Sequence, residues 1–81
     1  MNPLETLSQF PKRTKGIIKG YADSSEMPTK IMEMGLLPET KFMILHQAPF
    51  GGPMYVEFGK ERSRLELRQE EAEFIVVEKA I

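Results

Sequence analysis

Apolar and polar residues alternate along the second half of the chain. The segments "PMYVEF" (53–58) and "SRLELR" (63–68) place apolar side chains at every second position, which is typical of strands with one buried face. "KFMILHQA" (41–48) and "EFIVVE" (73–78) are rich in strand-favouring residues. The four segments recur roughly every ten residues, and this spacing predicts a small barrel or sandwich.

The same alternation predicts which side chains face the core. An apolar set should point inward: Met54, Val56, Phe58, Leu65 and Leu67. A charged set should point to solvent: Glu57, Arg64, Glu66 and Arg68. Residues 59–62 fit a tight hairpin turn, and residues 69–72 ("QEEA") fit one helical turn before the last strand.

The first half of the chain predicts one strand and one short helix. "TKGIIKGYA" (14–22) reads as a strand in which Gly16 and Gly20 mark bends or close backbone approach. Asp23-Ser24-Ser25 offers N-caps, and Pro28 fits a first helical turn. The helix has one apolar face, formed by Met27, Ile31 and Met34.

Helix-breaking residues follow this segment: Gly35 suits the position after the helix end, and Pro38 prevents the helix from resuming. With 81 residues the chain has room for a single domain (1–81). The pattern predicts a mainly β fold, a small five-stranded SH3-like barrel with one short α-helix inserted between the first and second strands.

Composition excludes several functional classes. Eleven basic and twelve acidic residues give a net charge of −1, which argues against a dedicated nucleic-acid binder. The chain has no cysteine and no long apolar run, so we expect a cytoplasmic protein without disulfides and without direct membrane insertion. The early basic residues, which include Lys15, are interpreted as a solvated face.

Candidate catalytic and metal-ligating residues are few. His46 is the one histidine, and a single imidazole can provide only weak transition-metal binding. The carboxylates from Glu57 to Glu73 stand beside basic residues, which favours cross-strand ion pairs over an acid–base pair. "FGGP" lacks the spacing of a phosphate loop. We expect no catalytic residue, no enzyme activity and no cofactor.

The segment "APFGGP" (48–53) places an aromatic residue inside a stiff turn. Pro49 and Pro53 fix the backbone at each end, and the two glycines between them supply positive φ angles. Two interpretations of Phe50 stay open. It could fold back as a plug over the end of the barrel, or it could be presented to a partner as an aromatic anchor.

Four segments in order resemble the FeoA family of small SH3-like proteins of bacterial ferrous iron uptake, over about residues 4 to 79. The first is the glycine-bounded strand "KGIIKGY" (15–21). The matching residues of the other three are Glu33, Gly35, Leu36 and Pro38, then Ala48, Pro49, Gly51 and Pro53, and last Arg68, Glu71, Ala72, Ile75 and Val77. The sequence departs from the family pattern in two places: Glu39 stands where glycine is usual, and Lys30-Ile31 replaces Arg-Leu.

The resemblance implies an accessory or regulatory protein that binds the cytoplasmic GTP-binding part of a FeoB-type iron transporter. A related SH3-like domain ends iron-dependent repressors of the DtxR type, so a stand-alone nucleic-acid-binding or metal-responsive regulatory domain is the alternative. Weak association of the protein with a second copy of itself is a further expectation. We expect the partner to bind an apolar patch formed by Met32, Leu37, Phe50, Met54 and Tyr55.

Overall fold

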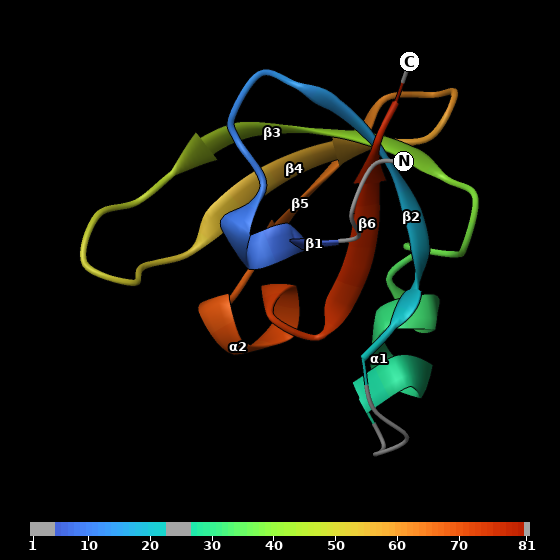
Figure 1. Ribbon diagram of the computed structural model, residues 1–81, viewed down its shortest axis with the longest axis horizontal. Helices are drawn as coiled ribbons and strands as arrows, with labels where there is room; N and C mark the ends of the chain where they lie inside the picture. Colours follow the sequence, from blue (N-terminus) through green and yellow to red (C-terminus); the bar gives the residue numbers. More distant parts are fainter. Residues whose placement is uncertain (1–4, 23–26, 81) are drawn as a thin grey trace.

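The computed structural model describes residues 5–22 and 27–80. Their strands form one curled antiparallel sheet (Figure 1). Its strands follow the order β1-β6-β2-β3-β4-β5. Their bounds are Glu5–Thr6 (β1), Lys15–Tyr21 (β2), Lys41–Gln47 (β3), Met54–Phe58 (β4), Ser63–Leu67 (β5) and Ile75–Lys79 (β6). The five predicted strands are confirmed. The additional β1 has two residues, too few for an alternating pattern.

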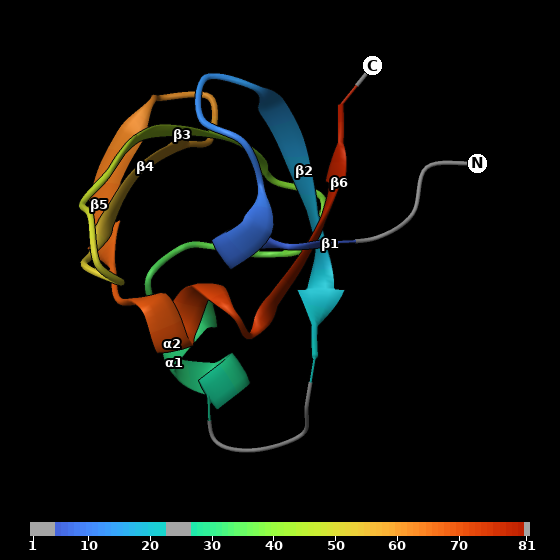
Figure 2. The same ribbon diagram turned by 60° about the vertical axis from the view of Figure 1, so that its left-hand side comes forward.

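Three short helical segments complete the described part of the chain: η1 (Leu7–Gln9), α1 (Met27–Glu33) and α2 (Gln69–Ala72). The predicted helix is α1, which lies between β2 and β3, and α2 is the predicted turn before the last strand. In Figure 2, η1 lies within the curl of the sheet, and both α-helices lie below it. None of these helices is long and apolar enough to cross a membrane.

The core lies inside the curl and follows the predicted alternation. Its buried apolar members are Leu7, Phe10, Ile18, Ile31, Leu36, Phe42, Ile44, Met54, Val56, Leu67, Ala72, Ile75 and Val77. Ile31 is fully buried and Met34 packs against the core, as the helical spacing predicts. The proposed caps at residues 23–25 lie outside the described residues, as do the side chains of Met27 and Pro28.

The two glycines of β2 have different roles. A Cβ at Gly16 would lie 2.5 Å from the ring of Phe42 and 2.9 Å from that of Phe10, so the predicted close approach is confirmed there. Nothing lies within 4 Å of a Cβ at Gly20. The β2–β6 register instead shifts between Ile18 and Gly20, and such a bulge increases the local twist of a sheet.

The exit from α1 is fixed by hydrogen bonds to β2. Gly35 has a φ of 98°, the conformation expected just beyond a helix end. The Tyr21 hydroxyl donates to the Leu36 carbonyl at 2.9 Å, and the Glu39 N–H donates to the Ile18 carbonyl at 2.6 Å. Glu39 has a φ of 72°, so this turn uses the left-handed conformation although glycine is absent.

Candidate functional site

The turn between β3 and β4 projects beyond the sheet at the left of Figure 1. The Gly52 N–H donates to the Pro49 carbonyl at 3.2 Å, and the Ala48 N–H donates to the Pro53 carbonyl at 2.9 Å. Phe50 and Gly51, the central residues, have φ angles of 59° and 71°. Two successive positive φ angles are the signature of a type I′ turn, which matches the twist of a hairpin.

Phe50 occupies a position in this turn that favours asparagine or glycine. A left-handed backbone costs a residue with a Cβ about 1–2 kcal/mol. The Phe50 side chain is fully exposed, so burial does not offset this cost. The interpretation of Phe50 as a plug over the barrel is therefore wrong. Residues with a strained backbone often cluster at functional sites, which favours a functional role for the exposed Phe50.

Tyr55 and His46 form a second aromatic feature on the same hairpin. The two residues are cross-strand partners, and their rings stack with centroids 5.9 Å apart and an interplanar angle of 29°. A hydrogen bond to the Glu66 carboxylate, with its negative charge, raises the pKa of the Tyr55 phenol. Because Glu66 is the β5 partner of Tyr55, the three side chains form one row across three strands.

Met54 does not belong to the predicted patch. Its exposed fraction is 0%, and it lies in the core together with Val56. The reason is the two-residue period of a strand: Met54 shares the inward face with Val56, whereas Tyr55 between them points outward.

Met32 and Leu37 are 44% and 48% exposed, as predicted. They lie in or just after α1, however, which is separated from the β3–β4 turn in both Figure 1 and Figure 2. The predicted patch therefore divides into a hairpin surface (Phe50 and Tyr55) and a helix-exit surface (Met32 and Leu37).

Within the part of the chain that the structure describes, His46 is not accompanied by the further ligands that a metal site needs. Among residues 5–22 and 27–80, no group of three or more histidine or carboxylate side chains could hold a metal ion. The ring of His46 instead stacks on Tyr55.

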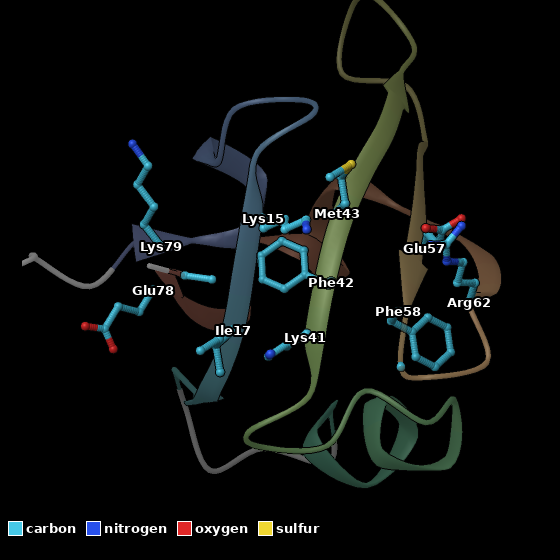
Figure 3. A pocket seen from close by; sticks show the side chains of 12 residues that line it. Lys15, Ile17, Lys41, Phe42, Met43, Glu57, Phe58, Arg62, Glu78 and Lys79 are labelled. Carbon is cyan, nitrogen blue, oxygen red and sulfur yellow. The ribbon is translucent and has the colours of Figure 1, made fainter.

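A groove on the outer face of the sheet was not anticipated from the sequence (Figure 3). Its lining includes two lysines and two apolar residues of β2 and β3, namely Lys15, Ile17, Lys41 and Met43. The sequence signal was present, since lysine and apolar residues alternate in "KGI" and "KFM". Only the strand register shows that these residues are neighbours.

The fold defines the chain as an SH3-like barrel domain. A model of the FeoA domain matches residues 5–79, so the chain belongs to the FeoA family. This confirms the resemblance carried by the four sequence segments. No significant match is found among curated proteins.

Solved structures agree with this assignment. The FeoA-like protein from Clostridium acetobutylicum is 30% identical, with 100% of this chain and 92% of that chain covered and a TM-score of 0.86. The iron(II) transport protein A from Clostridium thermocellum is 31% identical, with 93% and 45% covered and a TM-score of 0.81. A manganese-dependent transcriptional repressor shares the fold alone, at 17% identity, 99% and 38% coverage and a TM-score of 0.86.

Proposed function

We propose that the protein is a non-enzymatic accessory of ferrous iron uptake that works in the cytoplasm. It acts by binding the cytoplasmic GTP-binding part of a FeoB-type transporter. Membership of the FeoA family supports this function, as does the likeness to an iron(II) transport protein at 31% identity.

The observation that carries the proposal is the fully exposed Phe50 on its type I′ turn. An aromatic side chain already held on a rigid turn loses little conformational entropy when it inserts into a partner. Tyr55, on the same hairpin, is 41% exposed, so it adds contact area beside the turn. The hairpin surface is therefore the primary docking site, and the helix-exit surface is the second.

The test is calorimetric titration of the transporter's cytoplasmic domain with wild-type protein and with single variants. Truncation of an interface anchor typically costs about 2 kcal/mol, so Phe50→Ala should weaken binding about thirtyfold. Its melting temperature should not fall, because Phe50 makes no core contact.

Leu37→Ala is the comparison variant, because it removes a 48% exposed apolar side chain from the helix-exit surface and leaves the hairpin surface intact. Smaller losses are expected for Leu37→Ala than for Phe50→Ala. If the wild-type protein does not bind the domain, the proposed function is wrong. If Leu37→Ala alone abolishes binding, the function stands but docking occurs at the helix-exit surface.

The likeness to a manganese-dependent repressor favours a second candidate, a metal-responsive regulatory domain. This likeness concerns the fold alone, and the described residues provide no cluster of metal ligands. Partner binding that requires added manganese or ferrous ion would support this second function.

A further inference from the structure

The groove on the outer face of the sheet combines charge and apolar surface in a regular pattern. In the β2–β3 register Lys15 lies opposite Met43, and Ile17 lies opposite Lys41. The two lysines therefore occupy one diagonal of a four-residue square, and the two apolar residues occupy the other. Lys15 and Lys41 are exposed, whereas Ile17 and Met43 are half-buried and form the floor.

The carboxylates nearest to this square are already paired with other cations. Glu57 lies opposite Met43 on β4, and its Oε2 lies 3.5 Å from the Nε of Arg64. Glu78 lies opposite Ile17 on β6, and its Oε2 lies 3.8 Å from the Nζ of Lys19.

The lysines of the square, in contrast, have no paired carboxylate among the described residues. Within residues 5–22 and 27–80, neither Lys15 nor Lys41 has a carboxylate oxygen within 4.0 Å. Arg62 and Lys79 also line the groove (Figure 3). The groove is thus locally basic although the chain carries a net charge of −1.

The aromatic rings of this region are engaged with the protein itself. A Cβ at Gly16 would touch the Phe42 ring, and one at Gly35 would lie 3.0 Å from the Phe58 ring, so both rings pack over glycines. Proteins that bind single-stranded nucleic acid stack bases on exposed aromatic rings along a basic groove. The floor here offers aliphatic and thioether surface instead, which suits an apolar side chain of a peptide.

We infer that this groove binds an acidic segment of a partner protein in extended conformation, with an apolar residue between two carboxylates. Alternate residues of an extended chain point to the same side, so a Glu-x-Leu-x-Glu segment presents all three side chains to the sheet. The leucine covers Ile17 and Met43, and the carboxylates pair with Lys15 and Lys41. The inference rests on the proposed function in one respect: the acidic segment would belong to the same FeoB-type transporter.

The experiment uses a defined peptide, so it does not depend on the transporter. Isotope-labelled protein is titrated with the peptide Ac-GESLSEG-amide, and amide chemical shifts are followed by NMR. We expect saturable shifts at Lys15, Ile17, Lys41 and Met43. The glutamine counterpart, Ac-GQSLSQG-amide, should bind about fivefold more weakly, because exposed ion pairs contribute modestly.

The double variant Lys15→Gln/Lys41→Gln should bind Ac-GESLSEG-amide about fivefold more weakly than the wild type does. Lys60→Gln is the control, because Lys60 is exposed in the β4–β5 turn and does not line the groove. Phe50→Ala should bind the peptide as the wild type does, which separates this test from that of the proposed function. Absence of shifts, shifts confined to the β3–β4 turn, or an equal loss in Lys60→Gln would overturn the inference. Stronger shifts of the same amides by an oligothymidine would overturn it in favour of nucleic acid.

Discussion

The Nζ of Lys30 lies 2.9 Å from the Oε2 of Glu71 and so joins α1 to α2. The other oxygen of Glu71 accepts a hydrogen bond of 2.8 Å from the Arg68 N–H, which caps the start of α2. Glu71 is only 4% exposed, and burial by itself raises the pKa of its carboxyl. The Arg68 N–H and the Lys30 ammonium outweigh burial and hold that pKa below its ordinary value.

Glu71→Gln should therefore destabilise the domain in a pH-dependent manner. A carboxyl whose pKa is lowered in the folded state stabilises it above the unfolded value of 4.5, and the contribution disappears as the pH falls through the folded pKa. At pH 7, we expect a loss of about 1.5–3 kcal/mol in the free energy of unfolding. Urea denaturation measures it, and the gap to the wild type should shrink well below pH 4.5.

Glu70→Gln is the control for this prediction, because Glu70 is exposed and lies on the same short helix. It should change the stability little at either pH. A gap between Glu71→Gln and the wild type that is equal in acid and at neutral pH would show that the charge of Glu71 is unimportant.

Gly16→Ala should destabilise the core, whereas Gly20→Ala should not. The added methyl at Gly16 would lie within 3 Å of the Phe42 and Phe10 rings, and overpacking of this kind costs about 1–3 kcal/mol. A methyl at Gly20 meets nothing within 4 Å. Thermal denaturation of the two variants measures the difference, and equal melting temperatures would contradict the close approach at Gly16.

Glu39→Gly should be neutral or stabilising although it removes an ion pair. The left-handed backbone at Glu39 costs about 1–2 kcal/mol, and glycine relieves this cost. The Lys19 ion pair, at 3.0 Å, is exposed and contributes at most about 1 kcal/mol. Glu39→Ala loses the ion pair and keeps the strain, so its melting temperature should lie below that of Glu39→Gly. The reverse order would show that the turn is not strained.

Phe50→Asn should raise the stability while it removes the aromatic anchor. Asparagine followed by Gly51 is the preferred pair for a turn with two positive φ angles, so the gain should be about 0.5–1 kcal/mol. Chemical denaturation measures the gain, with Phe50→Ala as the control that removes the ring and keeps the strain. A less stable Phe50→Asn would mean that the ring contributes to folding.

Much of the barrel could be predicted because its strands have one buried face. The alternation in residues 53–58 and 63–68 identified the strands and their inward side chains, and Gly35 marked the end of α1. The same alternation shows why Met54 does not belong to the exposed patch: Met54 lies on the buried face with Val56, whereas Tyr55 lies on the outer face. Met54 was assigned to the patch from its closeness to Phe50 in the sequence, which is a weaker argument than strand periodicity.

The features that were missed depend on contacts between distant residues. Leu7 and Phe10 are buried members of the core, but they stand among polar residues in a segment without a repeating pattern. The Lys30–Glu71 pair joins two helices that are separated by three strands in the sequence. The groove arises because the register places Lys15 opposite Met43, and no local signal fixes that pairing.

The position of β6 between β1 and β2 has a consequence for how the protein is made. The segment that ends the described chain is an inner strand of the sheet, and it pairs with both N-terminal strands (Figure 1). While the ribosome is still adding residues 75–79, β1 has no neighbour and β2 lacks one of its two. The sheet of the nascent protein therefore lacks an inner strand until this segment has been synthesised, and until then the apolar faces of β2 and β3 can contact other chains.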